Sequence, residues 1–261
     1  MKTKRSLGQN FLTSKDIAEA LADSISVEEK DTVVEIGPGR GMITEILLKK
    51  AGHVIAGEKD GALYENLKEK FAEEIRSKRL ILIHDDILNF NPITYNLKPN
   101  TYKLLGSIPY NITSLLFRKF LEESSQPSHI AFIVQREVAE RIVAREGRES
   151  MLSISIKVYG TPRLVRKIHA GSFFPKPNVD SAILLIENIS KKNFSALSEK
   201  RFFQILHAGF SHPRKKLSSN LKSIVPSEKI TDVFNTCEIP KDIRAEKLSV
   251  ENWLCLAEAL A

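Results

Sequence analysis

Short apolar runs alternate with amphipathic segments along the first two thirds of the chain. The runs are rich in Val, Ile and Leu, as buried strands are. The segments 41–50 and 62–74 between them carry apolar residues at three- and four-residue spacing, which is the helical period. The repeated order of strand, helix and strand predicts a parallel sheet with right-handed crossovers. The five predicted strands are Thr32–Ile36, His53–Gly57, Leu80–His84, Tyr102–Leu105 and Ile130–Val134.

Two later segments, Ser153–Val158 and Ala182–Ile186, have the same strand-like composition and are separated by loops containing Pro and Gly. Together with the first five they predict a seven-stranded sheet. Beyond about Asn188 the pattern becomes helical, after a polar linker at 191–193. We therefore predict an α/β domain at 1–189 and a small helical domain at 190–261.

The composition is that of a folded, basic protein. Hydrophobic residues make up 42% of the 261 residues, which is enough for a packed core. Lys and Arg number 39 against 32 Asp and Glu, and the resulting charge of +7 favours a polyanionic partner. Residues 190–261 hold 12 Lys and Arg and 8 Asp and Glu, a net charge of +4. More than half of the excess therefore lies in the helical domain, where we expect a partner contact.

The two cysteines, Cys237 and Cys255, lie far from the rest of the predicted chemistry and suggest neither a disulfide framework nor a metal site. His207 and His212 have no neighbouring carboxylate or thiol, so no metal is predicted there either. The basic start of the chain continues into polar residues instead of the apolar run of a signal peptide. No run approaches the length of a membrane span. We expect a monomer in a reducing, cytoplasmic setting.

A glycine-rich turn follows the first predicted strand, as Gly37-Pro38-Gly39-Arg40-Gly41. Glycines at the start of a helix let the backbone approach a bound nucleoside closely. Glu58, 21 positions after Gly37, ends the next strand, where a carboxylate can accept hydrogen bonds from both ribose hydroxyls. The third glycine comes one residue too early for a typical dinucleotide site, which argues against NAD. A plain strand-to-helix turn is the structural alternative.

Two acidic residues near this turn have further candidate roles. Glu35 could orient the loop or, through water, the amino-acid part of a cofactor. Asp85 and Asp86 follow the third predicted strand, where one of them can accept a hydrogen bond from an exocyclic amine of a bound base. Paired aspartates after a strand are also frequent helix caps, so both interpretations of this pair remain open.

The tetrapeptide Ser107-Ile108-Pro109-Tyr110 ends the fourth predicted strand. An adenine amine is a poor nucleophile because its lone pair is delocalised into the ring. Its methylation therefore needs hydrogen-bond acceptors for the two amine N–H groups and a flat aromatic surface against the base. The Ser107 hydroxyl and the Ile108 carbonyl provide the acceptors, Pro109 stiffens the turn and Tyr110 provides the ring. The alternative is an ordinary proline turn with a buried tyrosine.

This tetrapeptide resembles the Asp/Asn/Ser-Pro/Ile/Leu-Pro-Tyr/Phe signature of amino-group methyltransferases that use S-adenosylmethionine. More of the chain resembles the bacterial small-subunit rRNA adenine dimethyltransferases, and the similarity spans nearly its whole length. The stretches that carry it are Arg5–Leu12, Glu35–Gly39, Gly106–Ile112, Phe173–Ser181, Phe210–Leu221 and Arg244–Ser249.

The resemblance implies a Rossmann-like seven-stranded methyltransferase domain followed by a helical rRNA-recognition domain. It implies transfer of two methyl groups to each of two adjacent adenines near the 3′ end of 16S rRNA, with a role in small-subunit maturation. It also implies that Phe173 stacks on the target adenine opposite Tyr110. The residues implied to line the S-adenosylmethionine site are Gln9, Asn10, Leu12, Gly37, Gly39, Glu58, Asp86 and Ser107. Most members have Asn at position 107, and serine there shortens the acceptor.

Two basic groups are candidates for rRNA contact. Arg141, Arg145 and Arg148 would share one face if 138–147 is a helix, although the glutamates between them are equally consistent with a salt-bridged surface. The second group is the cleaner cluster and consists of Arg214, Lys215, Lys216 and Lys222.

Three other functions compete with this interpretation. A large-subunit rRNA adenine methyltransferase would share the fold, the cofactor and the tetrapeptide. A non-catalytic RNA-binding or ribosome-assembly module would keep the fold without Glu58, Asp86 and Tyr110, which are all present. A nicotinamide dehydrogenase would leave the tetrapeptide unexplained.

Overall fold

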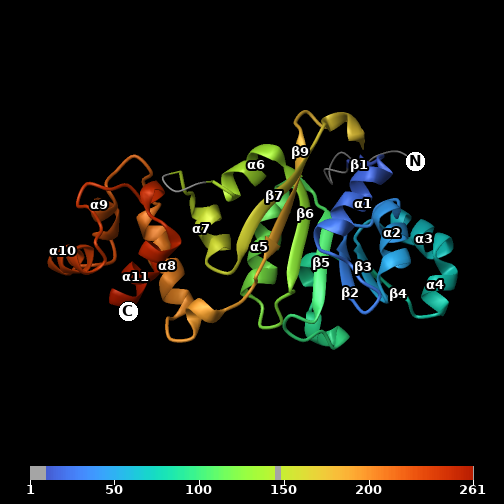
Figure 1. Ribbon diagram of the computed structural model, residues 1–261, viewed down its shortest axis with the longest axis horizontal. Coiled ribbons are helices and arrows are strands. Elements are labelled where there is room, and N and C mark those ends of the chain that lie inside the picture. Colours follow the sequence, from blue (N-terminus) through green and yellow to red (C-terminus); the bar gives the residue numbers. More distant parts are fainter. Residues whose placement is uncertain (1–9, 145–147, 261) are drawn as a thin grey trace. The chain divides into compact units, whose positions relative to one another are not determined.

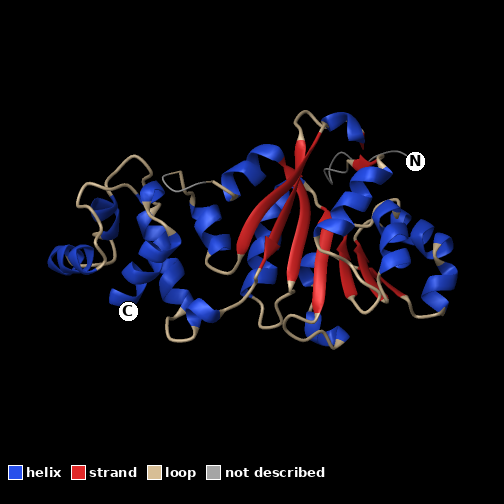
Figure 2. Cartoon of the chain, viewed as in Figure 1, coloured by secondary structure: helices blue, strands red, loops and turns tan. Residues whose placement is uncertain are grey.

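A seven-stranded sheet is the main β element of the computed structural model, which describes residues 10–144 and 148–260 (Figures 1 and 2). The strands follow the order β4-β3-β2-β5-β6-β9-β7 across the sheet. Parallel pairing runs from β4 to β6, whereas β9 is antiparallel to β6. The strands are β2 (Thr32–Ile36), β3 (His53–Glu58), β4 (Leu80–His84), β5 (Tyr102–Ser107), β6 (His129–Gln135), β7 (Thr161–Ile168) and β9 (Ser181–Glu187).

Six of the seven predicted strands are confirmed, and one is wrong. The segment predicted as a strand at 153–158 belongs to a helix, α7 (Met151–Lys157). A capping box between Ser150 and Ser153 begins this helix, and Ile154 and Ile156, which looked like strand alternation, are both buried in it. The seventh strand is β7, which the sequence pattern missed because this strand carries exposed Arg163, Arg166 and Lys167.

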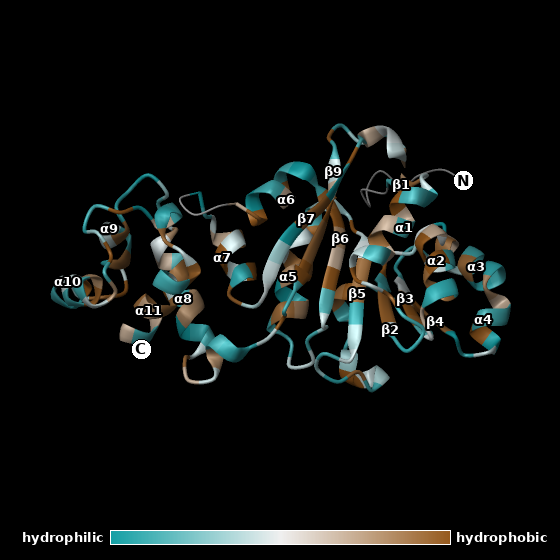
Figure 3. Ribbon diagram, viewed as in Figure 1, coloured by the Kyte–Doolittle hydropathy of each residue, from teal (hydrophilic) through white to brown (hydrophobic). Residues whose placement is uncertain are grey.

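The helices beside the sheet bury apolar residues in the core that they share with it, and the brown segments in Figure 3 mark hydrophobic residues of these helices. Leu21 and Leu47 are fully buried in the same core as Val33 and Leu105 of the sheet. The segment predicted as one helix at 62–74 is two helices that meet at Phe71. The helices of this part are α1 (Lys15–Ser24), α2 (Met42–Lys50), α3 (Gly61–Lys70), α4 (Ala72–Arg76), α5 (Thr113–Glu122) and α6 (Arg136–Ile142). Single-turn 3-10 helices cover Ile87–Asn89 (η2), Pro92–Tyr95 (η3), Tyr110–Ile112 (η4) and Ala170–Ser172 (η5).

A second, two-stranded sheet joins segments from distant parts of the sequence. Strand β1 (Phe11–Leu12) pairs antiparallel with β8 (Phe173–Phe174), so that Phe11 faces Phe174 and Leu12 faces Phe173. The backbone N–H and the hydroxyl of Thr13 both donate to the Ser172 carbonyl, each at 2.9 Å. The sequence pattern did not predict this sheet, because a two-residue strand has no period to detect.

The chain divides into two compact units. The first takes the chain up to Ala139 together with Pro162–Ile189, and the second takes Glu140–Thr161 together with the chain from Ser190 onward. In the second unit α7 is followed by η6 (Lys192–Phe194), α8 (Glu199–Gly209), α9 (Leu217–Leu221), α10 (Ser227–Thr236), η7 (Ala245–Lys247) and α11 (Val250–Ala259). The described part of 190–260 contains no strand. Trp253, Phe202 and Leu206 are fully buried in this unit.

The two cysteines, whose spacing suggested no disulfide framework, are paired in the structure. Cys237 and Cys255 form a disulfide across 18 positions of sequence, from the residue after α10 to the middle of α11. Packing of α10 against α11 brings the two residues together, and cysteine spacing alone could not reveal that contact. Among the described residues there is no group of three metal-ligating side chains and no helix long and apolar enough to cross a membrane.

Candidate functional site

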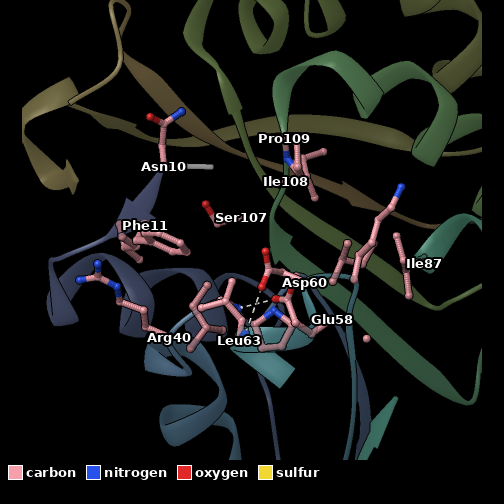
Figure 4. Close-up of a pocket in the computed structure, with 18 of the residues that line it drawn as sticks. Asn10, Phe11, Arg40, Glu58, Asp60, Leu63, Ile87, Ser107, Ile108 and Pro109 are labelled. Carbon is pink, nitrogen blue, oxygen red and sulfur yellow. Dashed lines mark hydrogen bonds between the residues drawn. The ribbon is translucent and has the colours of Figure 1, made fainter. Parts of the chain in front are cut away.

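A cavity of about 320 Å³ opens at the carboxyl ends of the parallel strands (Figure 4). The parallel register brings these ends together, because Ile36 pairs with Gly57 on one side and with Gly106 on the other. Except for Glu35, every described residue that the sequence analysis assigned to the cofactor or to catalysis lines the cavity, whereas Gln9 lies outside the described residues. These lining residues are Asn10, Leu12, Gly37, Gly39, Glu58, Asp86, Ser107, Ile108, Pro109, Tyr110 and Phe173.

The glycine loop requires the conformational freedom of its glycines. Gly37, Gly39 and Gly41 have φ values of +63°, +59° and +77°, in the left-handed region that other residues rarely adopt. A Cβ at Gly39 would lie 3.2 Å from the Phe11 ring, whereas a Cβ at Gly37 would meet nothing within 4 Å. Gly37 lines the cavity, so its bare backbone leaves room for a ligand at that point.

Glu58 is a buried carboxylate at the end of β3. Its two oxygens accept hydrogen bonds from the backbone N–H groups of Gly39, at 3.0 Å, and Asp60, at 2.8 Å. Burial raises the pKa of Glu58, and the two backbone donors oppose that shift. Each carboxylate oxygen still has a lone pair for a further donor. Glu58 is therefore anchored and can also accept from a diol such as that of a ribose.

Glu35 lies beneath the glycine loop and does not line the cavity. Its side chain is fully buried, and the Thr44 hydroxyl at the start of α2 donates to one of its oxygens at 2.7 Å. Burial raises the pKa of Glu35 to about 8, and the neighbouring charge of Glu58 adds to the shift. Of the two predicted roles, the contact with Thr44 favours orientation of the loop.

Asp86 combines the two roles that the sequence left open. It caps η2 by accepting from the Leu88 N–H at 3.0 Å, and it also lines the cavity. The Lys59 ammonium donates to its other oxygen at 2.8 Å. Burial opposes the charged form of Asp86, but the hydrogen bonds from Lys59 and Leu88 prevail and lower its pKa. The result is a fixed carboxylate at the cavity wall. Asp85 lies beside it and accepts from Asn89 at 3.0 Å.

The tetrapeptide turns out of β5 into η4 along the cavity. Figure 4 shows Ser107 between Asn10 on one side and Glu58 and Asp60 on the other. The Tyr110 hydroxyl lies 2.8 Å from the Ser181 hydroxyl at the start of β9, which fixes the direction of the ring. Burial raises the pKa of Tyr110, so the phenol stays neutral.

Phe173 reaches the cavity from β8 and is 5% exposed. Asp180 holds the chain around it, since its carboxylate accepts from the Ala170 N–H at 3.0 Å and its carbonyl accepts from the Arg136 N–H at 3.0 Å. Pairing of β8 with β1 places Asn10 and Leu12 at the same cavity. These three candidates therefore come together through the small sheet.

Several lining residues were missed by the sequence analysis, among them Phe11, Arg40, Lys59 and Asp60. Arg40 is part of the glycine motif, and its guanidinium carbon lies 4.7 Å from the centroid of the Phe11 ring. Asp60 caps α3 and was recognisable as an acidic residue two positions after Glu58. The contact between Arg40 and Phe11 joins residues 29 positions apart in the sequence, so no local pattern indicated it.

The basic candidates lie on the surface of the second unit. Arg214, Lys215 and Lys216 are exposed in the loop between α8 and α9, and Lys222 is exposed just after α9. The buried Asn220 side chain donates to the carbonyls of Gly209, at 2.6 Å, and His212, at 3.1 Å, and so holds this loop. Arg141 and Arg148 are also exposed, whereas Arg145 lies outside the described residues.

Comparisons with known proteins agree with these features. The family model for ribosomal RNA adenine dimethylases matches residues 1–261. A ribosomal RNA small subunit methyltransferase A from Dehalococcoides mccartyi is 40% identical over 99% of this chain and 89% of its own length. A protein of the same name from Clostridium botulinum is 33% identical over 99% of this chain and 94% of its own length.

Solved structures show the same fold. A dimethyladenosine transferase from Plasmodium falciparum has a TM-score of 0.80 at 24% identity and covers 94% of this chain and 95% of its own. The 23S rRNA methyltransferase ErmE has a TM-score of 0.75 at 23% identity and covers 96% of this chain and 99% of its own. The predicted Rossmann-like methyltransferase fold is thus confirmed, and the match over the full sequence shows that the chain belongs to the ribosomal RNA adenine dimethylase family.

Proposed function

We propose that this protein transfers methyl groups from S-adenosylmethionine to the exocyclic amines of two adjacent adenines near the 3′ end of 16S rRNA. One observation carries the proposal: the glycine loop with its two carboxylates and the Ser107–Tyr110 turn line a single cavity. Family membership and the names of relatives at 33–40% identity favour the small-subunit substrate. The protein then acts as a cytoplasmic monomer on the small ribosomal subunit, during its maturation.

The cavity has the donors and acceptors that an adenosine-based cofactor needs. Glu58 would accept hydrogen bonds from the ribose hydroxyls of the cofactor and Asp86 one from its adenine amine. The bare backbone at Gly37 and Gly39 would allow close approach. Asn10 and Leu12 close the site from β1. When bound, S-adenosylmethionine supplies an electrophilic methyl group on a sulfonium centre.

Ser107, Ile108 and the two aromatic rings orient the nucleophile. The Ser107 hydroxyl and the Ile108 carbonyl accept hydrogen bonds from the two N–H groups of the target adenine's amine. These bonds hold the nitrogen so that its lone pair is no longer delocalised into the ring. Tyr110 and Phe173 hold the base between them. Because a methylated ammonium releases its proton readily to water, no general base is needed. The hydroxyl of Ser107 fills the place that an Asn amide oxygen has in most of the family that this chain resembles.

The second unit provides the electrostatic part of rRNA binding. Arg214, Lys215, Lys216 and Lys222 are exposed, and Asn220 fixes the loop that carries the first three. Charges of this kind bind phosphates and position the substrate without reading its sequence. Arg141 and Arg148 of the same unit are also exposed and are further candidates for phosphate contact.

Transfer of labelled methyl groups to small ribosomal subunits that lack the modification tests the proposal. We expect dimethyladenosine in the digested rRNA with the wild type and none with Tyr110→Ala. Large subunits are the control substrate, and label in them would point to the large-subunit class instead. Tight binding of subunits and cofactor without transfer would indicate an assembly factor.

A further inference from the structure

Strand β8 carries two phenylalanines with opposite surroundings. Successive side chains of a strand point to opposite sides. Phe173 is 5% exposed and lines the cavity, whereas Phe174 is 56% exposed. Among the large apolar side chains in the part of the chain that the structure describes, only Ile93 is more exposed, at 62%. An aromatic ring so open to solvent, next to a cavity that accepts a nucleobase, is a candidate contact for nucleic acid.

Arg40 places a positive charge beside this ring. Its guanidinium carbon lies 5.9 Å from the centroid of Phe174 and 4.7 Å from that of Phe11, which is the residue that faces Phe174 in the small sheet. Phe11 and Arg40 both line the cavity, and Figure 4 shows Arg40 beside Phe11, on the opposite side of the cavity from Ile87. The exposed aromatic ring thus has beside it a cation that lines the cavity.

We infer that Phe174 and Arg40 form a stacking site for a second unpaired base of the RNA, the direct neighbour of the base that enters the cavity. Aromatic rings bind unstacked bases through their faces, and a guanidinium can bind the phosphate that joins two nucleotides. Because Phe173 lines the cavity and Phe174 is the next residue of the strand, a base on Phe174 would lie next to the cavity, beside the base that enters it. The inference rests on the proposed function and extends it: one adenine occupies the cavity while the other waits on Phe174.

Phe174→Ala and Phe174→Trp test this site in the transfer assay with unmodified small subunits. Removal of one stacking ring weakens binding by about tenfold or more. We therefore expect Phe174→Ala to raise the KM for subunits about tenfold and to leave both kcat and the Kd for S-adenosylmethionine within about twofold of wild type. Phe174→Trp should keep the wild-type KM. Ile93→Ala is the matched control, because it removes an exposed apolar side chain outside the cavity.

A short single-stranded RNA with 2-aminopurine next to an adenine gives a direct readout of stacking. Its fluorescence should fall on binding to the wild type and to Phe174→Trp, but not on binding to Phe174→Ala. Equal quenching by all three proteins would overturn the inference. So would a weaker Kd for S-adenosylmethionine in Phe174→Ala, since Phe174 would then support the β1–β8 pair. If the wild type transfers no methyl to small subunits, the proposed function itself fails, whereas transfer that Phe174→Ala leaves unchanged refutes only the stacking site.

Discussion

Replacement of Glu35 by Gln should flatten the pH dependence of folding stability. Glu35 is fully buried, and burial is the main cause that raises its pKa from 4.5 to about 8. Below pH 4.5 the carboxyl is protonated in both the folded and the unfolded chain and contributes nothing. Between pH 4.5 and 8 the unfolded chain releases this proton and the folded chain keeps it, so the free energy of unfolding falls as pH rises.

The magnitude follows from one proton. Its release by the unfolded state alone lowers the free energy of unfolding by at most about 1.4 kcal/mol for each pH unit, or roughly 3 kcal/mol between about pH 5.5 and 7.5. Gln is neutral at every pH and keeps an oxygen that can accept from the Thr44 hydroxyl, now 2.7 Å from the carboxylate. The free energy of unfolding of the variant, relative to that of the wild type, should therefore rise by roughly that amount over this pH range.

Urea unfolding of both proteins at about pH 5.5, 6.5 and 7.5, followed by circular dichroism, measures the effect. The free energies of unfolding of variant and wild type are subtracted at each pH, which cancels the contributions of all groups that titrate in both proteins. Glu45→Gln is the control, because it makes the same Glu-to-Gln exchange at an exposed position of α2. A constant difference for Glu35→Gln would refute the argument, since Glu35 would then titrate near its ordinary pKa.

Three further predictions concern the cofactor site and the basic loop. Asp86→Asn keeps a capping oxygen but removes the charge, and we expect about fivefold to tenfold weaker S-adenosylhomocysteine binding by calorimetry, whereas unchanged affinity would remove Asp86 from the site. Gly39→Ala forces a left-handed φ on a residue with a Cβ, and that Cβ presses on the Phe11 ring. Thermal unfolding should therefore show that the free energy of unfolding falls by about 1–2 kcal/mol. An unchanged melting temperature would contradict this prediction. Replacement of Arg214 and Lys215 by Ala should reduce the steepness of a plot of log affinity for small subunits against log salt concentration. The expected reduction is about 0.7–0.9 for each phosphate that these side chains neutralise. Plots with the same slope for variant and wild type would show that the two side chains bind no phosphate.

The parts of the fold that the sequence predicted are those with a local cause. The predicted strands that lead to the site, from Thr32–Ile36 to Tyr102–Leu105, are apolar because both faces of a parallel sheet are covered, and that burial is visible in each segment by itself. The glycine loop was predictable for the same reason, because its left-handed residues have to be glycines. The tetrapeptide follows directly on a strand and needs no distant partner to be recognised.

What the sequence did not predict depends on contacts between distant segments. Cys237 and Cys255 meet only because α10 packs against α11. The edge strand β7 has one neighbour in the sheet and exposes basic side chains, so it lacks the apolar run of a central strand. At the site itself, the pairing of Phe11 with Phe174 and the position of Arg40 beside both rings exist only in the folded chain.

The strand order explains why Ser107 belongs to both halves of the site. Glu58 ends β3 and Asp86 follows β4, on one side of β2, whereas Ser107 ends β5 on the other side. A Cβ at Gly106 would lie 2.5 Å from the Ile36 carbonyl, so glycine at that position lets β5 approach β2 where the glycine loop begins. Ser107 therefore stands between the carboxylates that suit the cofactor and the Ile108–Tyr110 turn that suits the adenine. A residue in that place can contact both reactants, which is why its exchange for Asn would be expected to alter methyl transfer more than folding.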